Sequence, residues 1–169
     1  MGVRALTLKD NIDNFRIDVE SNSQFIDKIL KDIIGKYCKD LDEAIDKIRE
    51  MLYSNSEQDW TTAEYEDIAM KLSLLLYYTS SAQENVGIRS DISNSLKTEK
   101  YNRILISTNG TAVEKKSQAE LSTQVETIVS IASTRAYKMI QSKVQVGFEL
   151  LAVIKKILSR RINEPSQSV

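Results

Sequence analysis

Residues 123–162 read TQVETIVSIASTRAYKMIQSKVQVGFELLAVIKKILSRRI, with no proline and a single glycine, Gly147. Apolar residues recur along this stretch in steps of three and four, which places them on one face of an α-helix. The opposite face is basic, with Glu149 as the acid in its interior. A helix of roughly 40 residues is about 60 Å long at 1.5 Å per residue. The stretch therefore predicts a long amphipathic helix with a basic outer side.

The stretch before it predicts a second long helix over residues 61–107. Thr61 and Glu64 form a capping box directly before an apolar run. Residues 74–78, LLLYY, are the most apolar patch of the chain and are wide enough to contact more than one neighbour. Gly87 is a candidate kink.

Two short signals separate these helices. Residues 108–110, Thr-Asn-Gly, predict a turn, because asparagine and glycine tolerate positive φ. Thr111 and Glu114 repeat the capping-box pattern and predict a short helix. Thr123 with Glu126 is a third box, which we expect to open the terminal helix.

The first 60 residues have weaker signals. Residues 1–20 predict a short helix or a loosely docked arm. Ser21 is the predicted N-cap of the next helix, with Gln24 placed to reach back to it. That helix continues to about residue 52, either as one bent helix or as two joined between Gly35 and Asp40. Residues 54–60 predict a loop, and the polar tail after residue 162 is expected to be disordered.

The predicted fold is all-α: a long antiparallel helical hairpin or coiled coil with an additional N-terminal helical segment, in an oligomer. The expected organisation is an N-terminal helical segment (1–58), a hairpin core (59–163) and a tail (164–169). A terminal helix this long buries its apolar stripe only if the 61–107 helix lies alongside it, and even that hairpin has little core. We therefore expect a homo-oligomer whose contacts include Leu72, Leu75, Leu76, Ile140, Val144, Leu151, Ile154 and Leu158.

The net charge of −1 conceals an asymmetry. Residues 1–84 hold 10 Lys/Arg and 17 Asp/Glu, a charge of −7, whereas residues 85–169 hold 13 and 7, a charge of +6. The basic half could bind a polyanion, or one half could dock on the other between subunits. The alternative is a helical protein whose solvated faces merely differ.

Composition points to the cytosol. The single cysteine, Cys38, excludes an internal disulfide framework and fits a reducing compartment. The N-terminus lacks the apolar core of a signal peptide, and no apolar run approaches the ~18 residues of a membrane span. Leu6 stands where a myristoylation motif requires serine or threonine.

We do not expect an enzyme, a metal or a cofactor. The chain has no histidine, and one cysteine cannot make a zinc site. Glycine-rich phosphate loops and nucleophile elbows are absent from the sequence. The acidic groups at residues 40–43 and 64–67 lie on charge-mixed helix faces, which favours a solvated surface over a magnesium site. Cys38 lies on an apolar stripe, which favours a buried hydrophobe over a nucleophile.

The basic residues form clusters that suit a nucleic-acid backbone, with tyrosines available to stack on bases. The candidate nucleic-acid-binding residues are Lys97, Lys100, Tyr101, Arg103, Lys115, Lys116, Arg135, Lys138 and Lys143. A further cluster at the end of the terminal helix could act as secondary ligands or could simply complement the dipole of the helix, and it comprises Lys155, Lys156, Arg160 and Arg161. Tyr137 is interpreted as a core residue. A membrane partner is not expected, because the narrow apolar stripe fits helix partners better than lipid.

Residues 60–162 resemble phage recombination mediators of the UvsY type. The resemblance lies in AEYEDIAMKLSLLLYYTSSAQENVGIRSDISNSLKTEKYNRI, a turn ending at Gly110-Thr111, KKSQAE, and RAYKMIQSKVQVGFELLAVIKKILSRRI. It implies a non-enzymatic oligomer in the host cytoplasm that binds single-stranded DNA and helps to load a RecA-type recombinase, by remodelling the complex of DNA with single-strand-binding protein. The residues between Lys97 and Lys116, and from Arg135 to Lys143, would then face DNA.

Three hypotheses follow, and the first is the leading one. The protein is a single-stranded-DNA-binding recombination accessory, or a structural or scaffold helical oligomer without nucleic-acid binding, such as a virion component. The third, an inhibitor of a host protein, has no supporting feature in the sequence. Within the first hypothesis, we expect direct DNA contact chiefly around Lys97 to Lys116, with the terminal helix serving assembly.

Overall fold

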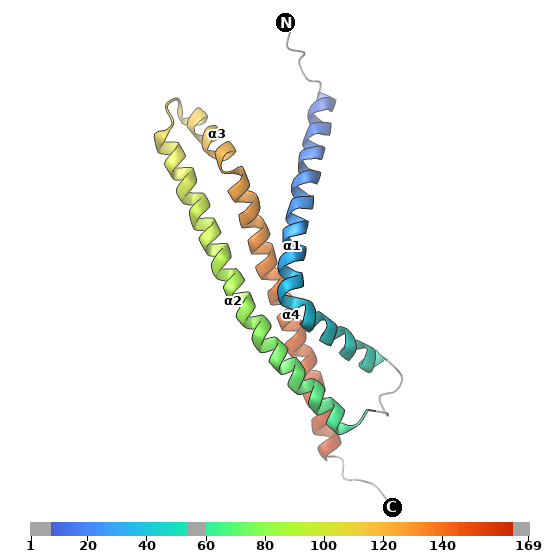
Figure 1. Cartoon of the computed structure of the whole chain (residues 1–169). Coiled ribbons are helices and arrows are strands. Elements are labelled where there is room, and N and C mark those ends of the chain that lie inside the picture. Colours follow the sequence, from blue (N-terminus) through green and yellow to red (C-terminus); the bar gives the residue numbers. More distant parts are fainter. Residues whose placement is uncertain (1–7, 54–59, 164–169) are drawn as a thin grey trace, which may run out of the picture. The chain divides into compact units, whose positions relative to one another are not determined.

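The structure is a computed structural model that describes residues 8–53 and 60–163, with side chains from residue 16 onward. Within these residues the fold is all-α and contains no strand, which confirms the predicted fold class. The helices in chain order are α1 (Leu8–Tyr53), α2 (Thr62–Ser107), α3 (Ala112–Ser122) and α4 (Gln124–Asn163) (Figure 1). The predicted tail and nearly all of the predicted loop, at residues 164–169 and 54–59, lie outside the described residues. No helix in the described part has both the length and the hydropathy that crossing a membrane requires.

Contacts divide the chain into two compact units. Unit 1 comprises Met1–Asp32 and Ser90–Arg135, and unit 2 comprises Ile33–Arg89 and Ala136–Val169. Helices α1, α2 and α4 each contribute a segment to both units. The division into segments 1–58 and 59–163 follows the order of the helices and stays a prediction.

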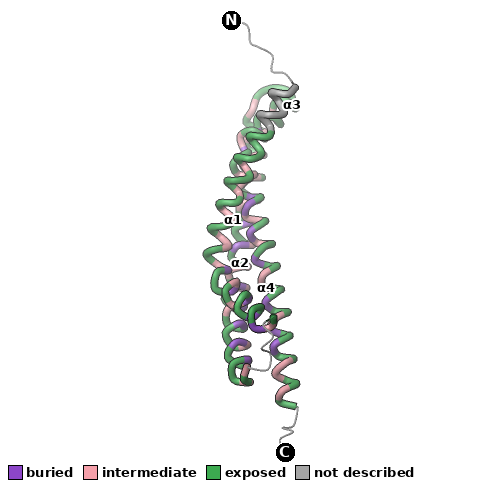
Figure 2. The backbone as a smooth tube through the Cα atoms, turned by 90° about the vertical axis from the view of Figure 1, so that its right-hand side faces the viewer, coloured by how far each residue is buried: buried purple, intermediate pink, exposed green. Residues whose placement is uncertain are grey.

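Unit 2 holds an apolar core between segments of α1, α2 and α4. Its largest fully buried side chains are Cys38, Leu41, Ile48, Tyr65, Leu72, Leu76, Ile140 and Ile154. The segments of α2 and α4 run antiparallel, because Gln83 donates to the Tyr137 hydroxyl (3.5 Å) whereas Tyr65 contacts Arg161. Buried positions recur along these helices at helical spacing (Figure 2). The hairpin expected from the sequence is therefore present in this unit.

Unit 1 is held together more by small and polar side chains. The hydroxyls of Ser90 and Thr134 lie 3.0 Å apart, and Ser130 donates to the side-chain oxygen of Asn94. These pairs again give α2 and α4 an antiparallel direction. Ser90, Ala119, Thr123, Ser130 and Ala132 are the buried residues of its described part. Short side chains let two helices approach closely, so hydrogen bonds replace a thick apolar core there.

Two predicted capping boxes are confirmed. The Thr61 hydroxyl accepts the Glu64 backbone N–H, and the Glu64 carboxylate accepts the Thr61 backbone N–H at 2.7 Å. Thr111 and Glu114 repeat this arrangement at the start of α3. Backbone donation by each threonine lowers the pKa of the paired glutamate below its usual value. Each carboxylate therefore stabilises its helix start while it is ionised.

The third predicted box is wrong. The Thr123 hydroxyl donates backward to the carbonyls of Ala119 and Glu120, so Thr123 caps the end of α3. Glu126 accepts a hydrogen bond from Lys100 instead of reaching back. The hydroxyl and the carboxylate that a capping box needs are both engaged elsewhere.

The predicted helix start at Ser21 is also wrong. Helix α1 runs without a break from Leu8 to Tyr53, and Gln24 reaches Glu20 at 3.4 Å rather than a cap. Serine and asparagine inside a helix cost only a few tenths of a kcal/mol each relative to better helix formers, about what a longer amphipathic helix can tolerate. Of the two readings offered for the region near Gly35, the single helix is the correct one.

Replacing Gly35 by alanine is expected to raise the free energy of unfolding by about 0.5 to 1 kcal/mol. A Cβ at Gly35 would meet nothing within 4 Å, so only the loss of backbone freedom in the unfolded chain remains. Urea denaturation followed by Trp60 fluorescence measures the change. The matched control is Gly87→Ala, whose Cβ would lie 3.1 Å from the Tyr137 ring and should gain less or lose. A Gly35→Ala variant that unfolds at lower urea than the parent would contradict the expectation.

Candidate nucleic-acid interface

Three of the five cations predicted to contact DNA between Lys97 and Lys116 are paired with acids. Lys100 on α2 donates to Glu126 on α4, and Arg103 donates to Glu99 at 2.5 Å. The Lys116 ammonium lies 3.9 Å from Glu120. Donation by Lys100 is the first cause that lowers the pKa of Glu126 below its usual value, so the hydrogen bond favours the ionised carboxylate.

The other predicted residues of unit 1 differ in their exposure. Lys97, Tyr101 and Lys115 are half-buried, and Arg135 is exposed. Arg135 lines a hollow together with Asp27, Ile26 and Ile131, between segments of α1 and α4. Residues 90–135 hold six Lys/Arg and five Asp/Glu, so this part of the chain is close to neutral. A near-neutral surface attracts a polyanion weakly.

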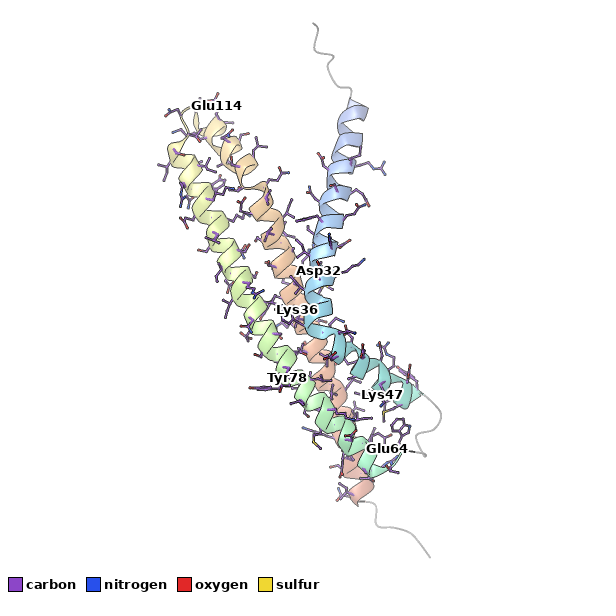
Figure 3. The ribbon with its side chains drawn as sticks, viewed as in Figure 1. Asp32, Lys36, Lys47, Glu64, Tyr78 and Glu114 are labelled. Carbon is purple, nitrogen blue, oxygen red and sulfur yellow. The ribbon has the colours of Figure 1, made fainter. Side chains whose placement is uncertain are left out.

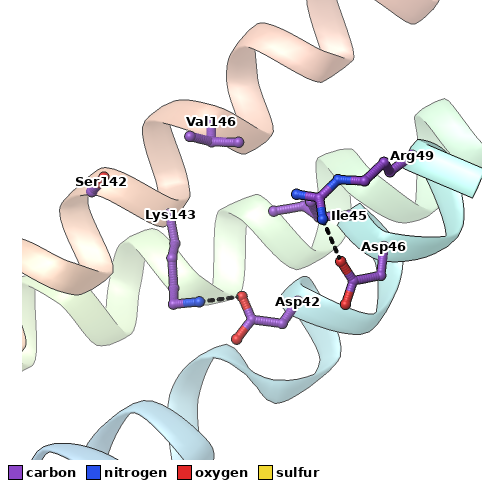
Figure 4. A pocket seen from close by; sticks show the side chains of 7 residues that line it. All are labelled: Asp42, Ile45, Asp46, Arg49, Ser142, Lys143 and Val146. Atoms are coloured by element: carbon purple, nitrogen blue, oxygen red, sulfur yellow. Dashed lines mark hydrogen bonds and ion pairs between the residues drawn. The ribbon is translucent and has the colours of Figure 1, made fainter. Parts of the chain in front are cut away.

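Lys143, a predicted contact in unit 2, is also engaged. Its ammonium donates to Asp42 on α1 at 2.5 Å, and both side chains are about one third exposed. The pair lines a shallow surface hollow beside Asp46 and Arg49, which lie 3.5 Å apart (Figure 4). Because the charges in this hollow pair with one another, we interpret Lys143 as a bridge between α1 and α4.

Positive charge is concentrated on the unit 2 segment of α4. Residues 136–163 hold six Lys/Arg and one acid, Glu149. Lys138, Lys155, Lys156 and Arg160 are exposed, and none of them has an ion pair within the described part of the chain. We call these four residues the α4 basic face. Only Lys138 among them belongs to the residues predicted from the sequence to bind DNA.

An exposed ring accompanies the α4 basic face. Phe148 is half exposed and precedes Lys155 by seven residues, which is about two helical turns, so both lie on one side of α4. Tyr137 does not provide an exposed ring of this kind. Its ring packs against Gly87 and its hydroxyl accepts from Gln83, as expected for a core residue.

Arg161 is distinct from the α4 basic face. Its guanidinium donates to the Trp60 carbonyl and lies over the Tyr65 ring, 4.6 Å from the ring centroid. This cation holds the end of α4 to the start of α2. The sequence spacing alone does not separate Arg161 from Lys155, Lys156 and Arg160.

The residues predicted to mediate assembly are used inside one chain. Leu72, Leu76, Ile140, Val144, Leu151 and Ile154 are buried within unit 2, while Leu75 and Leu158 are half-buried. Antiparallel packing of α2 on α4 covers this stripe without a second subunit. Contacts between subunits would require other residues, and homo-oligomerisation stays a prediction.

The described residues offer no evident catalytic constellation. They contain no group of three or more Cys, Asp or Glu side chains that could hold a metal ion. Cys38 is fully buried, and burial is the first cause that raises the pKa of its thiol, followed by the charge of Asp42. A buried thiol with a raised pKa is a poor nucleophile.

Comparison with known proteins adds no assignment. No protein-family model, no curated protein and no solved structure matches the chain. The class that the fold and its surfaces define is an all-α helical bundle protein with one strongly basic helix.

Proposed function

We propose that the protein is a non-enzymatic recombination accessory that binds single-stranded DNA through the α4 basic face. The observation that carries the proposal is the run of exposed cations without acidic partners along residues 138–160. By helical spacing Lys138, Lys156 and Arg160 lie within about 40° of one another on α4, and Lys155 lies to one side of them. Such cations neutralise phosphates and release their counterions, which supplies affinity without base specificity. Phe148 adds an exposed ring on which an unpaired base can stack.

The resemblance to phage recombination mediators supports the choice of single-stranded DNA among polyanions. In this proposal the protein coats or bends single-stranded DNA beside a single-strand-binding protein and favours loading of a RecA-type recombinase. The proposal moves the principal DNA contacts from Lys97–Lys116 to the α4 basic face. The reason is electrostatic, because three of the five cations of the first region pair with acids, whereas the four cations of the α4 basic face have no ion pair within the described residues.

Replacing Lys138, Lys155, Lys156 and Arg160 together by alanine is expected to flatten the salt dependence of DNA binding. Each phosphate contact on a single strand contributes about 0.7 to the slope of log K against log salt, so the slope should fall by about 2 to 3. Fluorescence anisotropy of a labelled poly-dT oligonucleotide between low and moderate salt measures it.

The matched control replaces four cations of unit 1, Lys97, Lys100, Arg103 and Lys116, by alanine. This variant removes the same charge but should change the slope by less than about 1, since three of its cations are held by acids. Equal salt slopes for the two variants would rule out the α4 basic face as the DNA-binding surface. A parent protein that binds no nucleic acid at low salt would do the same. Stimulation of recombinase filament assembly on DNA coated by single-strand-binding protein would test the accessory role.

A structural or scaffold oligomer is the second candidate function. It is favoured by the large apolar side chains that α2 leaves exposed, including Met70, Leu74 and Tyr77. Such a protein would assemble at increasing concentration and would not bind the oligonucleotide at any salt concentration. Light scattering with and without poly-dT separates the two functions.

A further inference from the structure

Helix α2 is apolar on two opposite sides. One side packs inside unit 2 through Tyr65, Ile68, Leu72, Leu76, Thr79 and Val86. The other side carries Met70, Leu74, Tyr77, Tyr78 and Ile88, each more than half exposed. Steps of four, three and eleven residues keep Met70, Leu74, Tyr77 and Ile88 within about 60° of one another on a helix of 3.6 residues per turn. We call these five residues the α2 outer face.

The α2 outer face is directed away from the rest of its unit. Figure 3 shows Tyr78 pointing outward from α2, on the side opposite α4. The rings of Tyr77 and Tyr78 pack edge to face with their centroids 5.6 Å apart, so the face presents an ordered aromatic surface. From residue 70 to residue 88 it is about 27 Å long. A continuous apolar strip of this length on a helix is typical of a contact with another helix.

Charged residues border the α2 outer face in an ordered way. Glu66 and Glu84 lie along one edge, and Lys71 and Arg89 lie along the other, by their helical positions. Each glutamate precedes a cation of the opposite edge by five residues. Glu66, Glu84 and Arg89 have no ion pair within the described residues, and Lys71 has one exposed partner on its own helix, Asp67.

The order of these charges selects an orientation. When two copies of one helix pack in parallel, the left edge of each meets the right edge of the other, with partners offset by five residues. Glu66 would then face Lys71, and Glu84 would face Arg89, on both sides of the contact. An antiparallel pair brings like edges together and sets Lys71 beside Arg89, which is repulsive.

We propose that the α2 outer face binds the same face of a second copy of this chain, with the two α2 helices parallel and in register. By its helical position Asn85 lies between Leu74 and Arg89, where it adds a polar group to the rim of the contact. The proposal does not depend on DNA binding, because no residue of the α4 basic face takes part.

The chemistry of the face favours a second copy over the other occupants. A polyanion would meet acids along one whole edge and no cation at the centre. A lipid surface would meet Glu66 and Glu84 at the apolar boundary, where cations are favoured instead. The complementary edges suit a helix that carries the same charges in the same order.

Cysteine cross-linking of the full chain tests the orientation. Ile88 is exposed, so the fold should tolerate Ile88→Cys. Under mild oxidation, two copies of this variant should form a disulfide-linked dimer. Met70→Cys should do the same if the pair is parallel. An antiparallel pair would instead give the mixed dimer when isotopically labelled Met70→Cys is oxidised together with Ile88→Cys. The unsubstituted chain, whose buried Cys38 remains, is the control and should stay monomeric on a denaturing gel.

A charge exchange provides the second measurement. Lys71→Glu with Arg89→Glu should weaken the dimer at least about tenfold by light scattering or sedimentation, since both edges then become acidic. Adding Glu66→Lys and Glu84→Lys exchanges the edges and should restore dimer formation. Three results would each overturn the proposal. The parent stays monomeric at all attainable concentrations, or the Met70→Cys and Ile88→Cys chains form a mixed disulfide with each other. The third is a four-residue exchange that fails to restore the dimer while the circular dichroism spectrum stays unchanged.

Discussion

Leu76→Ala is expected to lower the free energy of unfolding of unit 2 by about 2 to 5 kcal/mol. Leu76 is fully buried where α2 meets α4, and its methyl group occupies the space above Gly147. Truncation removes apolar burial and leaves a cavity that the two helices cannot close without a shift. Urea denaturation followed by the fluorescence of Trp60, the single tryptophan of the chain and a residue of unit 2, measures the loss.

The same contact predicts a change of sign at Gly147. In the parent, a Cβ at residue 147 would lie 2.6 Å from Leu76 Cδ2, so Gly147→Ala should destabilise despite the better helix propensity of alanine. In the Leu76→Ala background the space is free, and Gly147→Ala should stabilise by up to about 1 kcal/mol. A double-mutant cycle measures this coupling. Additive effects of the two substitutions would show that Leu76 and Gly147 do not share the contact.

The periodic parts of the sequence predicted their structure well. The terminal stretch was expected at residues 123–162 and α4 is Gln124–Asn163; the preceding one was expected at 61–107 and α2 is Thr62–Ser107. Apolar residues at steps of three and four report burial on one side of a helix, and the Thr61 and Thr111 boxes report where a helix begins.

Signals that depend on the partner of a side chain were less informative. Thr123 and Glu126 have the spacing of a capping box, but Lys100 on another helix takes the carboxylate. Ser21 has the character of an N-cap, but α1 continues through it. The local sequence makes a capping hydrogen bond possible, and tertiary contacts determine whether it forms.

The candidate site was only partly accessible to sequence reasoning. Charge counting located the basic half of the chain, but counting could not separate paired from unpaired cations. Lys143 pairs with Asp42 on another helix, which its sequence neighbours do not indicate, whereas Arg103 pairs with Glu99 four residues before it on the same helix. Likewise, the apolar run at residues 74–78 predicted a contact with more than one neighbour, and the structure buries Leu76 while it leaves Leu74 and Tyr77 exposed.

Tyr65→Ala is expected to lower the free energy of unfolding by about 3 to 5 kcal/mol. Tyr65 is 1% exposed at the start of α2 and lies beneath the Arg161 guanidinium. Truncation removes the burial of the ring and the platform that holds the last turn of α4. Tyr65→Phe keeps both and should cost less than about 1.5 kcal/mol. Equal losses for the two variants in urea denaturation would contradict a role for the ring.

Arg161→Met separates the structural role of this contact from the proposed DNA surface. The variant keeps the apolar stem but loses the hydrogen bond to the Trp60 carbonyl and the cation over Tyr65. We expect a loss of about 1 to 2 kcal/mol in stability, and little further loss when it is combined with Tyr65→Ala, because the two residues share one interaction. Under folded conditions the salt slope of oligonucleotide binding should stay within about 0.7 of the parent, since Arg161 is turned toward the protein. A larger fall in slope would place Arg161 with Lys156 and Arg160 among the cations that contact DNA.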